Sequence, residues 1–392
     1  MSNQTDPSVT PTGMAAVPAA VGDVIRGTVE DVKGLPQAAS AVAAFPSKAT
    51  LLPLLLAQFL NSYDSSSMNV AISEIAADLN TTATGVQTAL AFYTLVMAAG
   101  MIVGSKLSDI IGRRRAFTIG VIIYGVGALI TAFAPSIGVM FLGWSILEGI
   151  GSCLMIPPIY ILVTVNYTDL KMRAAAFGAV SAAAGLGGAS GPLIGGIITT
   201  AVSWRLSFAL EALVVILIVM MRGRIVDAGV AKKKPKLDIP GAILSGVGMI
   251  GLVGGLLLAG NYGWFTARQD FSVAGNVLLE EGQISPTIVA FVLGLLFLIG
   301  FGLFEGYMER SGKEPLVRMH VILNRVAAAG LTTQAAQWLL SVGIIFIVSL
   351  FLQVTFGYNA IETGLMLIPA IIGMLFFSRR SEKLARKYPP KG

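Results

Sequence analysis

Trp204-Arg-Leu-Ser-Phe-Ala-Leu-Glu-Ala-Leu-Val-Val-Ile-Leu-Ile-Val-Met-Met221 contains one acid and, near its start, one base. Its remaining side chains are almost all apolar. A helix needs about 20 apolar residues to cross a hydrocarbon core of about 30 Å. Every backbone polar group in lipid must also be satisfied within the segment. The stretch therefore predicts a transmembrane helix.

Similar stretches recur along the 392 residues, of which 55% are hydrophobic and 12% charged. Soluble domains carry about 25% charged residues. The alternation typical of a membrane β-barrel is absent. We therefore predict an all-α polytopic membrane protein. Its ten spans are 50–72, 84–106, 115–134, 137–163, 173–201, 204–221, 239–260, 286–306, 327–355 and 361–378.

The basic residues predict the orientation of these spans. With the N-terminus in the cytoplasm, 25 of the 27 Lys and Arg residues fall in cytoplasmic segments, and only Arg205 and Arg268 fall outside. Positive residues concentrate on the cytoplasmic side of membrane proteins. The net charge of +6 is thus explained by topology and does not require a nucleic-acid partner. We expect a multi-pass protein of the cell (plasma) membrane.

The chemistry-bearing residues argue against an enzyme. The chain has one cysteine, Cys153, and one histidine, His320. This composition excludes an intrachain disulfide, a His/Cys metal site inside the membrane and a Ser-His-Asp triad there. A phosphate-binding G-x-x-x-x-G-K-[ST] loop is also missing. We therefore expect no cofactor, no metal, and an ion gradient as the source of energy.

Two glycine-rich motifs stand out. The first is Gly104-Ser-Lys-Leu-Ser-Asp109-Ile-Ile-Gly112-Arg113-Arg114-Arg115, between the second and third spans. Its glycines permit close packing and a tight turn. Asp109 can pair with a cation or a helix N-terminus. The second is Gly187-Gly-Ala-Ser-Gly191-Pro192-Leu-Ile-Gly195-Gly196, in the fifth span. Small residues there allow helix backbones to approach closely, and Pro192 predicts a kink.

Together these motifs resemble the major facilitator superfamily, in which G-x-x-x-G-P-x-x-G-G marks antiporters. Three further stretches resemble its drug:proton antiporter branch with fourteen helices. They are Asp64-Ser-Ser-Ser-Met-Asn69-Val-Ala-Ile72, Trp204-Arg-Leu-Ser-Phe208 and Leu352-Gln-Val-Thr-Phe-Gly-Tyr-Asn-Ala-Ile-Glu-Thr-Gly364. The sequence departs from the pattern at Ile110 and Ser73. It departs again at Glu148, because the fourth span usually carries Arg and then Gln before Gly-x-Gly.

Acids inside the spans are candidate functional residues, because a charge at the bilayer centre costs about 2.5–3.5 kcal/mol. Asp64, Glu148 and Glu211 fall within predicted spans, and Asn69 belongs to the first-span motif. The resemblance implies that spans one and four line a central cavity. An acid there can load and release a proton, and a cationic substrate can compete for it. The alternative is a packing role for each acid. Glu305, near a cytoplasmic end, is expected to be solvated.

The predicted organisation has four parts. Residues 1–49 form a cytoplasmic N-terminal tail, expected to be disordered, with a surface-lying amphipathic helix as the alternative. Residues 50–221 form a first six-helix bundle. Residues 222–326 hold a cytoplasmic linker and two inserted helices. Residues 327–392 hold the first two helices of a second bundle and a basic C-terminal tail.

The resulting functional hypothesis is proton-coupled efflux of hydrophobic or cationic small molecules. The expected partners are a small-molecule substrate, protons and membrane lipid. One alternative is the export of a native lipid, siderophore or metabolite. Another is a fragment or accessory membrane protein that does not transport.

Fourteen helices are implied by the resemblance, and ten are predicted here. We therefore expect a chain of ten spans to bind substrate poorly. We also expect it to exchange no protons unless a second chain or a fusion supplies the missing helices.

The charge asymmetry generates a test of topology. In a Cys153→Ser background, single cysteines at 234 and 268 are offered a membrane-impermeant thiol reagent in intact cells. We expect labelling at 268 and protection at 234, because only the former faces outward. The opposite pattern would overturn the orientation.

Overall fold

The computed structural model describes residues 48–227, 236–273 and 276–357, together with positions 366, 369 and 373. Almost all of the predicted N-terminal tail, the linker lysines at 232–234, the tenth span apart from those three positions and the basic C-terminal tail lie outside these residues.

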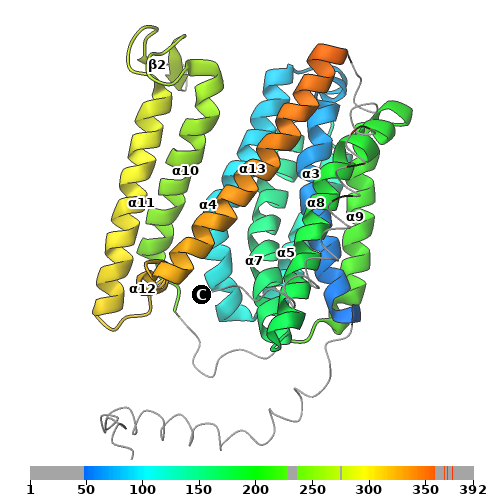
Figure 1. Ribbon diagram of the computed structural model, residues 1–392. Helices are drawn as coiled ribbons and strands as arrows, with labels where there is room; N and C mark the ends of the chain where they lie inside the picture. Colours follow the sequence, from blue (N-terminus) through cyan, green and yellow to red (C-terminus); the bar gives the residue numbers. More distant parts are fainter. Residues whose placement is uncertain are drawn as a thin grey trace, which may run out of the picture. The chain divides into compact units, whose positions relative to one another are not determined.

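Long helices occupy all nine predicted spans that fall in the described part (Figure 1). They are α3 Lys48–Asp78, α4 Ala83–Ile111, α5 Arg113–Ala132, the run of α6 Ile137–Met140, η1 Phe141–Glu148 and α7 Gly149–Asn166, α8 Leu170–Ala201, α9 Trp204–Met220, α10 Ile239–Tyr262, α11 Pro286–Arg310 and α13 Arg325–Phe356. Shorter elements are η2 Met221–Arg224, α12 Met319–Ile322 and the strands β1 Phe271–Val273 and β2 Asn276–Leu279.

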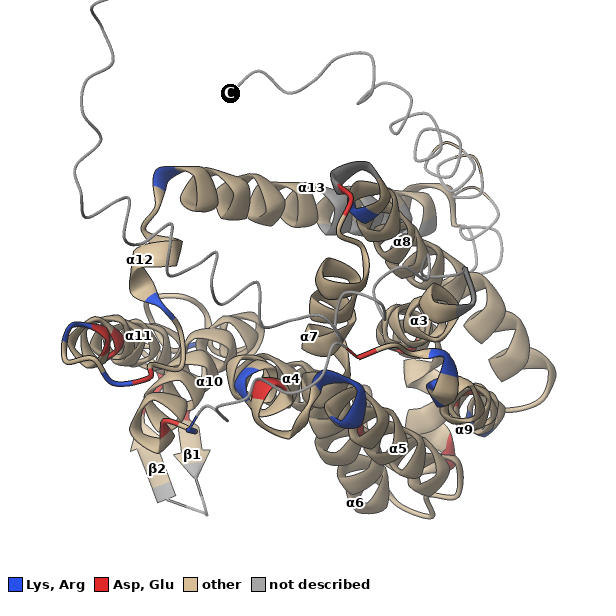
Figure 2. Cartoon of the chain, turned by 90° about the horizontal axis from the view of Figure 1, so that it is seen from below, with Lys and Arg blue, Asp and Glu red and all other residues tan. Residues whose placement is uncertain are grey.

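Seven of the described helices are long and apolar enough to cross a membrane. Seen from below, the helices are tan with only short stretches in the colours of charged residues (Figure 2). The all-α prediction is confirmed. The strands β1 and β2 form a small antiparallel hairpin in the loop between α10 and α11, where only a loop was predicted.

Local sequence explains where several helices begin. Thr82, Asp169, Asp238 and Asn324 each accept a hydrogen bond from a backbone N–H in the first turn of the following helix. Such N-caps satisfy donors that have no partner within the helix. The α4–α5 turn falls at Gly112, whose φ of 98° lies in a region that favours glycine. The tight turn predicted at this position is confirmed.

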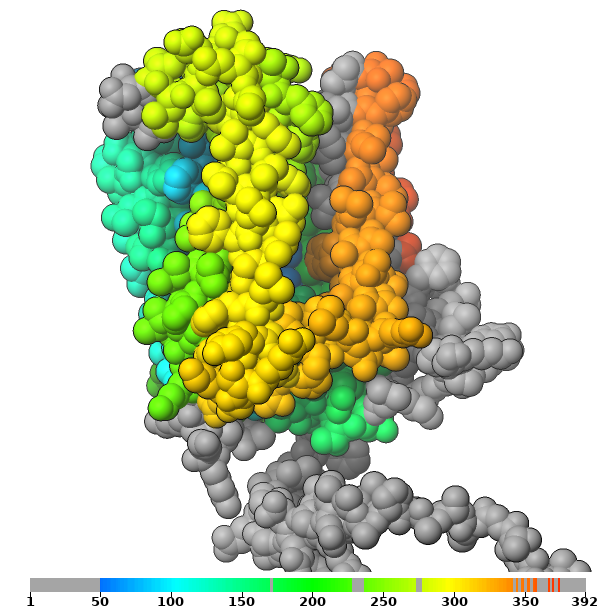
Figure 3. All heavy atoms as spheres, turned by 90° about the vertical axis from the view of Figure 1, so that its left-hand side faces the viewer, coloured from blue at the N-terminus to red at the C-terminus, as the bar shows by residue number. Residues whose placement is uncertain are grey.

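Helices α3 to α9 share a buried interior. The main pairings join α3 with α8, α5 with both α7 and α9, and α4 with α7. Helices α10 and α11 pair with each other, and α10 also packs against α4. The Lys106 Nζ donates to the Pro315 carbonyl at 2.7 Å, which joins the end of α4 to the chain after α11. Figure 3 shows a groove between α11 (yellow) and α13 (orange).

The second glycine motif brings α8 into direct contact with α3. A Cβ added at Gly187 would lie 3.0 Å from the Tyr63 nitrogen, and one at Gly195 would lie 2.6 Å from the Ser67 Cβ. At Gly191 it would collide with the Ser66 side chain. These three glycines are four residues apart, so they share one face of α8. The close packing predicted for this motif is confirmed at these positions.

A polar cluster ties the far ends of α3 and α9. Trp204 Nε1 donates to Asp78 Oδ2 at 3.0 Å, and Arg205 forms an ion pair with the same carboxylate. Arg205 also donates to the Ala134 carbonyl at 2.8 Å. Arg205, the only basic residue of the predicted sixth span, therefore has partners on both α3 and the chain after α5.

The α3–α8 contact predicts that Gly191→Ala lowers the stability of the purified protein. Overpacking of this kind costs about 1–3 kcal/mol. Gly188→Ala in the same motif is the matched control, because a Cβ there meets nothing within 4 Å. Alanine at 188 should be neutral or stabilising by up to about 1 kcal/mol. Thermal unfolding in detergent measures both variants, and equal melting temperatures would contradict the packing role.

Candidate functional site

Three buried acids converge at the centre of the first six helices. Asp64 on α3 and Glu148 at the end of η1 are 0% exposed, and Glu211 on α9 is 1% exposed. One carboxylate oxygen from each lies within 4.8 Å of the others. The sequence singled out all three residues, and the structure brings them together.

Trp144 of η1 fixes the carboxylate of Asp64. Its Nε1 lies 3.1 Å from both Asp64 oxygens. The indole is fully buried between Tyr93, stacked at 6.0 Å between ring centroids, and Phe208, in an edge-on contact at 6.0 Å. These ring contacts hold the N–H donor toward the carboxylate, so Asp64 is the acid with a donor to both oxygens.

The two glutamates are less completely satisfied. Tyr124 of α5 donates its hydroxyl to Glu211 Oε2 at 3.0 Å, and Glu211 Oε1 has no partner among the described residues. Neither oxygen of Glu148 lies in hydrogen-bonding geometry to any donor in the described part. Buried polar atoms are usually paired, and this cluster holds three carboxylate oxygens without a partner among the described residues.

A π-helical segment positions Glu148. The segment Phe141–Glu148 interrupts the fourth span, and single π turns are frequent at functional sites. A Cβ at Gly127 would lie 2.6 Å from the Gly143 carbonyl and 2.7 Å from Glu148 Cγ. Helix α5 therefore passes directly against this segment and leaves the glutamate side chain little freedom.

A second polar network lies beside the acids. The Asn61 amide donates to the Tyr93 hydroxyl and to Ser152 Oγ, each at 2.8 Å, and these two oxygens are 3.2 Å apart. The sequence analysis missed this group, as it missed Trp144 and Tyr124. The signal that could have identified these residues is their polar groups in the middle of predicted spans.

Other predicted residues lie away from the acids. The exposed Asn69 donates to the Ser65 carbonyl of its own helix at 2.9 Å. Pro192 lies inside α8 without ending it, and Gly196 is buried in the same helix. These residues belong to α3 and α8, and none of them forms a hydrogen bond with the three carboxylates in the described part.

The first glycine motif forms the α4–α5 corner. Gly104 lies against the backbone of Cys153 in α7, which confirms the predicted close packing. Asp109 of α4 pairs with Arg113 of α5 at 3.2 Å, across the Gly112 turn. The Arg114 backbone N–H donates to Asp227 Oδ2 at 3.0 Å. The corner is therefore held by charges on both sides of Gly112.

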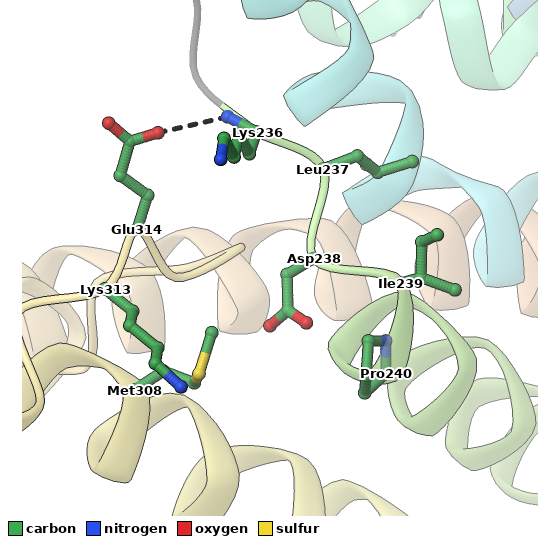
Figure 4. Close-up of a pocket in the computed structure, with 8 residues that line it drawn as sticks. All are labelled: Lys236, Leu237, Asp238, Ile239, Pro240, Met308, Lys313 and Glu314. Atoms are coloured by element: carbon green, nitrogen blue, oxygen red, sulfur yellow. Dashed lines mark hydrogen bonds between the residues drawn. The ribbon is translucent and has the colours of Figure 1, made fainter.

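Glu305 was predicted to be solvated, and the structure shows that this prediction is wrong. Glu305 is 0% exposed, because the chain after α11 folds back and the Val317 N–H donates to Glu305 Oε2 at 3.2 Å. Beside it is a pocket of about 590 Å³ (Figure 4). Its lining residues are Lys236, Leu237, Asp238, Ile239, Pro240, Met308, Lys313 and Glu314. The Lys236 backbone donates to Glu314 Oε2 at 3.0 Å across this pocket.

The long apolar helices of this fold define a polytopic helical membrane protein. Residues 54–392 match the Major Facilitator Superfamily. The chain therefore belongs to the Major Facilitator Superfamily, which confirms the resemblance at the level of the superfamily.

The similar proteins include several named as exporters or resistance proteins. The chain is 27% identical to the puromycin resistance protein pur8 of Streptomyces alboniger, over 83% of this chain and 60% of that protein. It is 28% identical to the cephamycin export protein CmcT of Amycolatopsis lactamdurans, over 83% and 63%. The chain thus spans less than two thirds of the length of these relatives.

A solved structure shows the same fold. The proton:xylose symporter XylE aligns with a TM-score of 0.50 at 12% identity, over 87% of this chain and 69% of that one. At this level of identity the similarity concerns the arrangement of helices alone.

The hydrogen bond from Tyr124 generates a stability prediction. Tyr124→Phe removes the donor to Glu211 and leaves a buried oxygen unpaired, at a cost of about 1–3 kcal/mol. Tyr160→Phe is the control, because the Tyr160 ring stacks on Phe177 and its hydroxyl donates no hydrogen bond in the described part. The control should change stability by less than about 0.5 kcal/mol. Chemical unfolding followed by tryptophan fluorescence compares them, and equal losses would contradict the assignment.

Proposed function

We propose that this chain forms the substrate- and proton-binding part of an exporter that exchanges hydrophobic or cationic small molecules for protons. Asp64, Glu148 and Glu211 are the groups that exchange the proton. The observation that carries the proposal is the convergence of these three buried acids, with three of their oxygens unpaired.

Electrostatics support a proton-binding role. Two ionised carboxylates within 4.8 Å repel each other by at least about 3 kcal/mol at an effective dielectric constant of 20. Each charge in the bilayer also costs about 2.5–3.5 kcal/mol. The cluster therefore does not hold three negative charges without a counter-ion. A proton that leaves must be replaced by another positive charge, and a cationic substrate can supply it.

The hydrogen bonds distinguish the three acids. Asp64 receives the indole N–H on both oxygens, whereas Glu148 lies in hydrogen-bonding geometry to no donor among the described residues. A cationic substrate that enters near Asp64 therefore meets a carboxyl group whose orientation is held by Trp144.

The proposal also assigns the chain to the antiporters and to the fourteen-helix branch of the superfamily. Antiport is supported by the complete G-x-x-x-G-P-x-x-G-G motif, whose glycines 187, 191 and 195 lie against α3. The fourteen-helix branch is supported by the α10–α11 pair, which stands in the chain between the first six long helices and α13. The proposal also includes the predicted domain limits, the location in the plasma membrane and the cytoplasmic N-terminus. Relatives named for puromycin resistance and cephamycin export support a small-molecule substrate.

Neutral variants of the acids test the proposal. The chain is expressed together with a second chain or a fusion that supplies the helices implied by the resemblance, and uptake of ethidium, a hydrophobic cation, is measured in everted membrane vesicles with an imposed acid-inside gradient. Asp64→Asn, Glu148→Gln and Glu211→Gln should each lower the gradient-driven rate to below about a tenth of wild type, because a titratable group in the membrane is lost.

Glu305→Gln is the matched control for that experiment. Glu305 is also fully buried, but it belongs to the α10–α11 pair and contacts the chain after α11. Its variant should keep the wild-type rate at equal expression. Absence of gradient-driven uptake by the wild type, or wild-type rates in all three acid variants, would refute the proposal.

A further inference from the structure

The three acids have the geometry of a cation site. Asp64, Glu148 and Glu211 are the only group of three or more potential metal-ligating side chains found in the described part of the chain, and their ligand atoms lie within 4.8 Å of one another. Calcium–oxygen bonds are 2.3–2.6 Å long, so oxygens on opposite sides of one ion are separated by up to about 5 Å. Three atoms within 4.8 Å of one another lie at most about 2.8 Å from a common point, close to the length of a calcium–oxygen bond.

A second observation is the state of Glu148. This side chain is completely buried, and both of its oxygens are unpaired among the described residues. Its oxygen faces those of Asp64 and Glu211, and the contact of Gly127 with its Cγ restrains it there. A buried carboxylate that is unpaired and aimed at two others is left with its full desolvation cost. A bound cation removes that cost.

The donor atoms identify the class of ion. All three ligands are carboxylates, and oxygen-only sites suit calcium, magnesium and manganese rather than softer metals. The three acids supply three oxygens within 4.8 Å of one another, and second oxygens of the ionised carboxylates or water complete the 6–8 ligands that calcium takes. Two ionised carboxylates and one protonated carboxyl group balance the charge of one divalent ion, so the occupied site is neutral.

We propose that Asp64, Glu148 and Glu211 bind one divalent cation of the calcium type. This inference rests on the proposed function in that the same acids are assigned to proton exchange there. The cation and the protons then occupy the same carboxylates in turn. A transporter loaded with the ion is closed to proton exchange until the ion leaves.

Trp144 provides a direct measurement of binding. Its indole nitrogen is 3.1 Å from the Asp64 oxygens, so excitation of this ring sensitises the luminescence of a bound terbium ion, used in place of calcium. The purified 392-residue chain in detergent should show saturable, tryptophan-sensitised emission that calcium displaces. Glu148→Gln and Glu211→Gln should abolish it, while Glu305→Gln should keep it.

Two tryptophan variants separate this site from the surface. Trp144→Phe should lose the emission but still bind one radioactive calcium ion per chain in equilibrium dialysis. Trp204→Phe should keep the emission, although Trp204 contacts the more exposed Asp78. Emission that depends on Trp204 and not on Trp144 places the ion at the surface and overturns the inference. No saturable emission, or emission unchanged in both glutamine variants, also overturns it.

The transport and ion-binding measurements test the proposed function and the cation site separately. Gradient-driven ethidium uptake by a protein that binds no terbium or calcium refutes the cation site and leaves proton exchange standing. Calcium-displaceable terbium binding without gradient-driven uptake refutes proton exchange and supports the cation site. Size-exclusion profiles matched to wild type confirm that each variant is folded.

Discussion

Direct contact between helix backbones is the constraint on which the site depends. Asp64 lies where it does because three glycines of α8 let α3 approach without intervening side chains. Glu148 depends on a similar contact, in which Gly127 of α5 meets the carbonyl of Gly143. In a membrane, helix association relies on close packing rather than on expulsion of water. The glycines therefore determine the distances between the carboxylates, although no glycine belongs to the site.

Much of the fold was predictable because membrane helices are selected by length and hydrophobicity. The nine described long helices follow the predicted spans, and their ends differ by a few residues, as in α3, which continues to Asp78. Asp64, Glu148 and Glu211 were predicted as candidates, because acids are rare in such segments. Their convergence was not predictable, since it depends on how helices far apart in sequence pack together.

The parts that sequence reasoning missed have physical reasons. The π segment at 141–148 requires one additional residue per turn, which leaves no change in composition. The partners Trp144 and Tyr124 are ordinary interior residues until the helices that carry their acceptors are in place. Glu305 was misjudged because its distance from the helix end suggested water, whereas a later segment covers it. Asn69 has the family position but is directed along its own helix.

The attachment of the α10–α11 pair has a mechanical consequence. α10 packs against α4, and the Lys106 ammonium holds the chain after α11 through the Pro315 carbonyl. Both ties connect the pair to α4, one of the first six helices. If one half of such a transporter rocks against the other, the α10–α11 pair moves together with the first six helices. The chain that joins this pair to α13, which includes α12, then has to accommodate the relative motion.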